Sequence, residues 1–256
     1  MKCSRIPRAT PGNICSLVSK ALLYALVAAA GNVLGALAVT RRAVRELRVI
    51  ELLVAFGAGF MLSVAIVELL PAALSRGGNL APALVLVGYL AVHLTQHTVT
   101  PHFHFGEETH PVSSVAGTSA LVGLLLHTFF DGVAIASAFL VRPELGIMVF
   151  IAIFLHKLPE GVTISSLMLA GGRSGGRAVG AAALLGVATL VGVVLTEQMG
   201  FLVQNGLALS AGVTIYVAAS NLVPEFQGKK GWKLPAAFFA GAAIFFVTKV
   251  IIDSTS

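Results

Sequence analysis

Two short strings of the sequence combine residue types that bind metal ions. His127 stands four positions before Asp131, and His156 four positions before Glu160, and a glycine directly follows each carboxylate. On a helix, residues four apart lie on one face about one turn from each other. Both strings interrupt strongly apolar sequence, and ionisable groups inside a membrane are costly enough to indicate a functional site. The pattern predicts a metal site built by two helices.

The two strings are expected to lie at the same depth. Arg142 and Pro143 divide the two apolar segments, which predicts a helical hairpin. Reflected through position 143, the midpoint of the first pair falls on position 157, and the midpoint of the second pair is 158. Two imidazoles and two carboxylates would then converge, a ligand set that suits Zn²⁺ or Fe²⁺. The alternative is that these groups only hold helices together through hydrogen bonds, which fits two matched pairs less well.

The composition indicates that membrane-spanning helices position these residues. The chain is 57% hydrophobic and 11% charged, with a mean hydropathy of +0.92, whereas a soluble domain carries about 25% charged residues. A net charge of +6 would suit nucleic acid, but the basic residues are scattered through short loops, so we expect no nucleic-acid partner. Cys3 and Cys15 form neither a metal-binding spacing nor a disulfide framework.

The hydropathy pattern predicts an all-α membrane protein with eight transmembrane helices. A span needs about 20 apolar residues. Eight segments meet this need: 17–39, 50–74, 80–98, 115–140, 145–170, 178–199, 206–224 and 235–252. The first continues too far past Ala30 to be a signal peptide. Asn205 and Gly206 mark the start of the seventh. We expect one transmembrane domain over 17–252, tails at 1–16 and 253–256, and a His-rich loop at 99–114.

The loop charges predict an orientation. Most loop lysines and arginines follow the first, fifth and seventh segments, and basic loops face the cytoplasm. The basic N-terminal tail argues the other way but carries fewer such residues. We therefore expect a multi-pass protein of the plasma (inner) membrane with both termini outside.

Further metal-binding candidates lie outside the two strings. Met61 and Glu68 are two helical turns apart in the second segment, where Met61 alone would suit core packing and Glu68 a helix end beside Pro71. Histidines cluster between the third and fourth segments and predict a loop metal relay. These are His93, His97, His102, His104 and His110. A polar interfacial loop is the alternative for this tract.

Together these motifs resemble the ZIP (Zrt/Irt-like) family of divalent metal transporters. The resemblance rests chiefly on the strings 127–132 and 156–161, and it extends over essentially the whole chain. Weaker matches are Gly59 to Leu62, Glu68 to Pro71, Ile215 to Val217 and Asn221 to Glu225.

The resemblance implies an eight-helix ZIP-like bundle that moves a divalent metal into the cytoplasm. Zinc is the expected metal, with iron, manganese and cadmium as further candidates. The site would lie between helices 2, 4 and 5. Its ligands would be His127, Asp131, His156 and Glu160, with Met61 able to add another. It further implies no enzyme activity and no prosthetic group. The partners would be the metal ions and the lipid bilayer, with a homodimer left open.

Two positions depart from relatives that hold two metals side by side. Thr128 and Lys157 stand where those relatives have an oxygen ligand and an acidic residue. A protonated lysine cannot ligate a metal, but its compact ammonium can occupy the place of a second cation. We therefore expect Lys157 to pair with Asp131 or Glu160.

Two rival functions follow from the same residues. A membrane-embedded metal-dependent hydrolase would use such a site, but it also needs an open coordination position and a separate base. The sequence contains no HExxH motif. A carrier of protons or monovalent cations would use the histidines and carboxylates without a metal.

Overall fold

The computed structural model describes residues 11–41, 47–98 and 114–254, and within them it is helical and contains no strand. The α-helices are α1 (Pro11–Thr40), α2 (Leu47–Val64), α3 (Leu70–Arg76), α4 (Ala81–Thr98), α5 (Ser114–Val141), α6 (Pro143–Ala170), α7 (Gly175–Gln198), α8 (Gly200–Tyr216), α9 (Pro224–Gln227) and α10 (Lys233–Ser254). Two π-helical turns, η1 (Ala65–Leu69) and η3 (Val217–Leu222), and a short 3₁₀ turn, η2 (Gly78–Leu80), connect some of them.

Eight helices in the described residues are long and apolar enough to cross a membrane, which confirms the predicted number. The second crossing runs from α2 through η1 into α3, and the seventh runs from α8 through η3. The predicted start of the seventh at Gly206 is wrong, because α8 begins at Gly200. Asn205 donates its side-chain amide to the carbonyl of Phe201 within the helix. A Cβ on Gly206 would stand 2.6 Å from Ser137 Oγ, so this glycine serves close helix packing.

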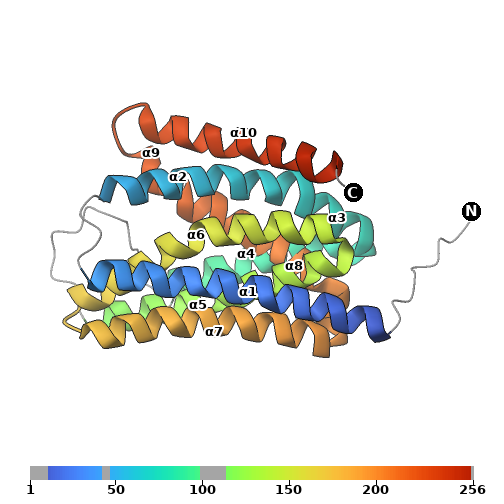
Figure 1. Ribbon diagram of the computed structural model, residues 1–256, viewed down its shortest axis with the longest axis horizontal. Coiled ribbons are helices and arrows are strands. Elements are labelled where there is room, and N and C mark those ends of the chain that lie inside the picture. The colour runs from blue at the N-terminus through green and yellow to red at the C-terminus, as the bar shows by residue number, and fades with distance from the viewer. Residues whose placement is uncertain (1–10, 42–46, 99–113, 255–256) are drawn as a thin grey trace, which may run out of the picture.

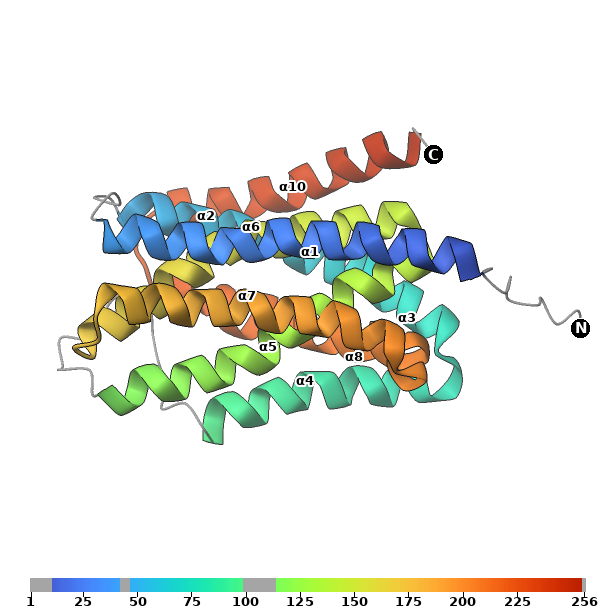
Figure 2. The same cartoon turned by 60° about the horizontal axis from the view of Figure 1, so that its bottom comes forward.

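The crossings form a four-helix unit with two helix pairs packed on it. Helices α1, α5, α6 and α7 pack along one another, while α10 packs along α2 and α4 along α8. Figure 1 shows α10 on the outside of the bundle, and Figure 2 shows α4 on another side of it. The described chain begins and ends at the same end of the bundle. We call this the hairpin end, because α5 and α6 meet there, and the opposite end the cavity end.

The glycine after each carboxylate lets a neighbouring helix approach the metal-binding strings. A Cβ on Gly161 would stand only 2.0 Å from the carbonyl oxygen of Asn32 in α1. A Cβ on Gly132 would stand 1.9 Å from the carbonyl oxygen of Thr189 in α7. Such backbone contact between helices is open only to small residues. Each string is therefore backed by a second helix, α6 by α1 and α5 by α7.

Helix α6 continues through Pro159. Proline removes one helical hydrogen bond and leaves the carbonyl four residues earlier without its helical partner. That carbonyl belongs to Leu155, and it lies 3.7 Å from the position that a Cβ on Gly57 of α2 would occupy. Pro159 thus marks the place where α2 packs closely on α6.

Candidate metal centre

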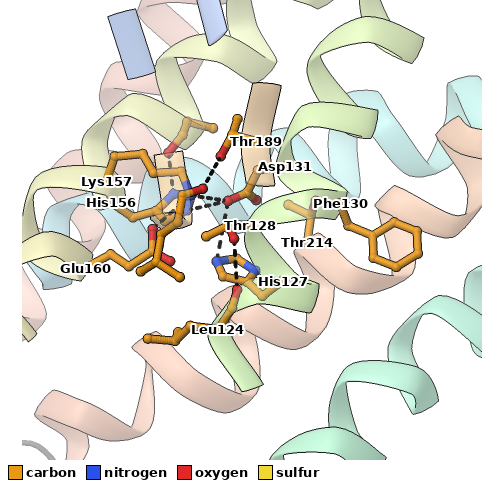
Figure 3. Close-up of polar contacts among 12 residues, drawn as sticks. Leu124, His127, Thr128, Phe130, Asp131, His156, Lys157, Glu160, Thr189 and Thr214 are labelled. Atoms are coloured by element: carbon orange, nitrogen blue, oxygen red, sulfur yellow. Dashed lines mark hydrogen bonds and ion pairs between the residues drawn. The ribbon is translucent and has the colours of Figure 1, made fainter. Parts of the chain in front are cut away.

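The four residues singled out by the two strings converge in the interior of the bundle. His127 and Asp131 extend from α5, and His156 and Glu160 from α6. Each offers one ligand atom, and these atoms all lie within 4.8 Å of one another. All four side chains are buried, and Figure 3 shows them pointing toward one another. We call these four residues the central cluster.

The hydrogen bonds of His156 prepare its ring for metal binding. Its Nδ1 lies 3.0 Å from the carbonyl oxygen of Ala152, one turn back in α6. Only a protonated nitrogen can donate to a carbonyl, so Nδ1 carries a proton, and Nε2 is the ring nitrogen that faces the other residues of the central cluster. Nε2 faces Asp131, 3.4 Å from Oδ2. An outer hydrogen bond of this kind sets the tautomer and ring orientation of metal-ligating histidines.

Lys157 lies between the two carboxylates. Its Nζ is 2.7 Å from Asp131 Oδ2 and 2.8 Å from Glu160 Oε2, and the side chain has no exposed surface. We expected the ammonium of Lys157 to pair with Asp131 or Glu160, and in the structure it contacts both (Figure 3). The other departing residue, Thr128, donates its hydroxyl to the carbonyls of Leu124 and Leu125 in its own helix.

The central cluster keeps atoms that lack hydrogen-bond partners. In the described part of the chain, Glu160 Oε1 and His127 Nδ1 are buried and accept or donate no hydrogen bond. Buried polar atoms are nearly always paired, so each exception needs an explanation. A carboxylate oxygen and an imidazole nitrogen are both metal ligands. These residues therefore fit a divalent cation, whose binding would satisfy Glu160 Oε1, an acceptor that the described residues leave unpaired.

Asn32 of α1 is a buried polar residue of the site that the sequence analysis missed. With the amide oriented so that its nitrogen meets acceptors, Nδ2 lies 2.6 Å from the carbonyl oxygen of Lys157 and 3.2 Å from Glu160 Oε2. Glu160 Oε2 is thus held by both Lys157 and Asn32, while Oε1 is left for a ligand. An amide in the middle of an apolar span was a signal that could have identified it.

A cavity of about 290 Å³ extends from the central cluster toward the cavity end. His127, His156 and Glu160 line it, together with residues at the ends of α4 and η3. The polar ones among the latter are Gln96, His97, Ser220 and Asn221. Two of the lining residues, His97 and Pro224, are exposed, so the cavity reaches the surface there.

The structure places Glu68 away from the central cluster, and it buries Met61 in the apolar core. Glu68 lies in η1 near the hairpin end, where its two carboxylate oxygens accept from Arg142 and Lys249. Met61 is fully buried in the main apolar core and is not among the residues that line the cavity. Seven residues make two turns only in an uninterrupted α-helix, and a π turn takes up more residues per turn. The turn η1 therefore rotates Glu68 off the face of Met61.

The histidines of the predicted relay are only partly described. His93 and His97 lie on the last turns of α4, with ring centroids 4.0 Å apart, and His97 Nδ1 lies 2.8 Å from the carbonyl oxygen of His93. His97 lines the cavity. His102, His104 and His110 lie outside the described residues.

Comparison with known proteins agrees with this arrangement. The family model of the ZIP zinc transporters matches residues 106–249, which include all four residues of the central cluster. Zinc transporter ZIP6 of Homo sapiens is 30% identical over 134 residues, which are 49% of this chain. Zinc transporter ZIP9-B of Xenopus laevis is 28% identical over 159 residues, 56% of this chain. Zinc transporter foi of Drosophila melanogaster is 31% identical over 110 residues, 42% of this chain.

The matches cover only part of these relatives. The aligned segment spans 18% of ZIP6, 52% of ZIP9-B and 16% of foi.

Proposed function

Because the chain belongs to the ZIP zinc transporter family, we propose that it carries divalent metal ions, chiefly zinc, through the membrane by way of the central cluster. The observation that supports this most directly is the meeting of two imidazoles and two carboxylates within 4.8 Å inside a bundle of eight membrane-length helices. Members of the family are transporters and not enzymes, and no observation favours a hydrolase.

The ligand set favours zinc over the hard alkaline-earth ions. Zn²⁺ accepts histidine nitrogen and carboxylate oxygen in a four-coordinate site, whereas Mg²⁺ and Ca²⁺ prefer oxygen ligands alone. The names of ZIP6 and ZIP9-B describe those proteins as zinc transporters. Fe²⁺ and Mn²⁺ share part of this ligand preference, so they are the expected competitors.

The proposed direction is toward the cavity end, which we assign to the cytoplasm. Basic residues are enriched in cytoplasmic loops. In the described residues, Arg41, Arg173 and Lys229 are among those at the cavity end, where the chain passes between helices. Metal released from the central cluster would pass through the cavity beside His97 and Asn221. We propose that the relay histidines assist this last step.

We further propose that the central cluster holds one metal ion at a time. The ammonium of Lys157 is a fixed positive charge between Asp131 and Glu160, where it occupies the place of a second cation. A metal bound by the four residues of the central cluster would thus share its carboxylates with Lys157.

Uptake into proteoliposomes tests the proposal. Purified protein in sealed vesicles is offered Zn²⁺, Fe²⁺, Mn²⁺, Cd²⁺ or Co²⁺ in turn, and His156→Ala in identical vesicles serves as the control. We expect saturable zinc uptake that the control lacks. Absence of saturable flux for all five ions, in protein that still binds zinc, would contradict a transport function. A flux carried equally by His156→Ala would contradict the site.

A further inference from the structure

Four charged side chains meet at the hairpin end, opposite the cavity. Glu68, in η1, is buried, and its two carboxylate oxygens accept separately from Arg142 and Lys249. Arg142 also lies 3.8 Å from Asp253, and Lys249 lies 3.0 Å from the same carboxylate. We call these four residues the end charge cluster. None of them belongs to the metal-binding set of the central cluster.

The end charge cluster connects the metal-bearing hairpin to other crossings. Arg142 is the single residue between α5 and α6, whereas Glu68 belongs to the second crossing, and Lys249 and Asp253 to α10. A further contact strengthens this connection, because Arg76 at the end of α3 donates to the carbonyl of Val141, at 3.1 Å. The tip of the hairpin is therefore held on the pair formed by α2 and α10.

Transport requires the central cluster to be reached from each end in turn, usually by movement of one helix group against another. Here the cavity reaches the surface at the cavity end, and the end charge cluster holds the hairpin at the other. A movement that opened the hairpin end by separating α5 and α6 from α2 and α10 would break the contacts of Arg142 with Glu68 and Asp253.

We propose that the end charge cluster is a releasable latch that stabilises the conformation in which the metal cavity opens at the cavity end. This inference rests on the proposed transport function. Arg142 and Asp253 have 40% and 41% of their side-chain surface exposed, so water can solvate them when they separate. Glu68 keeps Lys249 as a partner from its own helix pair, and therefore no buried carboxylate is left without a cation when Arg142 leaves.

Reversible crosslinking tests the latch. In a background with Cys3 and Cys15 replaced by serine, Glu68→Cys is combined with Arg142→Cys and bridged by a short, reducible bis-methanethiosulfonate reagent. The matched control combines Glu68→Cys with Lys249→Cys, which bridges two crossings that pack along each other. We expect bridging to abolish saturable zinc uptake in the first protein, reduction to restore it, and the control to retain uptake when bridged.

The outcomes separate the latch from the transport proposal. Full uptake by the completely bridged Glu68–Arg142 protein would overturn the latch, and so would an equal loss in the bridged control. Zinc content by elemental analysis should be unchanged by bridging. Absence of flux in the reduced protein and in wild type, with zinc still bound, would overturn transport itself and with it the latch. If Glu68→Cys lowers expression, Arg142→Cys with Asp253→Cys repeats the test at two exposed positions.

Discussion

The central cluster and the end charge cluster both bring two carboxylates together in an apolar bundle, but the balance of cations differs. In the central cluster, Asp131 and Glu160 share the single ammonium of Lys157, and Glu160 Oε1 has no hydrogen-bond partner among the described residues. In the end charge cluster, Glu68 and Asp253 face two cations and both oxygens of Glu68 are paired. A shortage of donors therefore distinguishes a place that receives a cation from one that holds helices together.

Removing a ligand from the central cluster should have the largest effect. We expect Glu160→Ala or His156→Ala to abolish saturable metal uptake and leave the protein folded in the membrane, because each removes a quarter of the converging ligand set. Glu68→Ala is the matched control, and it should retain metal bound in the helix core while altering the rate of uptake. Equal expression is verified by surface-labelled protein. Near-normal uptake by both ligand variants would mean that the central cluster, like the end charge cluster, does not bind the transported metal.

Changing the charge of the central cluster should alter how many ions it holds. We expect wild type to bind one ion in the helix core and Lys157→Asp to bind two, since the variant replaces a cation between two carboxylates with another oxygen ligand. Elemental analysis on proteins that also lack the loop histidines measures the ratio of metal to protein. Lys249→Asp should still bind one core ion. Two core ions in wild type would reject the fixed-charge role of Lys157.

Asn32 should have an intermediate effect, because it positions a ligand without offering one. Loss of a partner that orients a metal ligand typically weakens metal affinity by about 10–100-fold, and we expect Asn32→Ala to fall at the lower end of that range. The maximum rate should change less than the apparent affinity. Asn205→Ala is the control, since its amide donates to the carbonyl of Phe201 within its own helix. Unchanged zinc affinity in Asn32→Ala would mean that Lys157 alone holds Glu160.

The smallest effect is expected from the loop histidines. Replacing His102, His104 and His110 by serine should shift the apparent affinity for zinc by less than Asn32→Ala does, because a loop outside the two ligand helices tunes delivery and does not form the site. The measurement is the concentration dependence of uptake in the same vesicles. Complete loss of flux in a folded triple variant would show that metal binding is not confined to the central cluster.

The convergence of the four residues could be predicted from the sequence because it needs only the rise of an α-helix and the position of one hairpin turn. Reflection through the hairpin turn places His127 and Glu160 at nearly the same depth. Lys157 is expected beside Glu160 because it lies about one helical turn from it. The number of crossings follows from length and hydropathy in the same way. Each of these inferences depends only on local helix geometry, on one turn between adjacent helices, or on the length of an apolar segment.

Contacts between distant segments were not predictable by the same reasoning. Asn32 meets Glu160 only because α1 packs along α6, and no local pattern specifies that pairing. The position of Glu68 depends on η1, which interrupts the α-helical periodicity. The start of α8 was misjudged because Gly206 serves helix contact and not a chain break. In each case tertiary packing decided the outcome.

The link between α5 and α6 has a mechanical consequence. Arg142 alone separates Val141 from Pro143, and the proline fixes its own backbone torsion at the first position of α6. With so short a link, neither helix can slide or turn far without carrying the other. Both halves of the ligand set therefore keep their relative height during any movement of the bundle. A force applied at Arg142, which lies 11 positions from Asp131 and 14 from His156, therefore acts on both ligand pairs together.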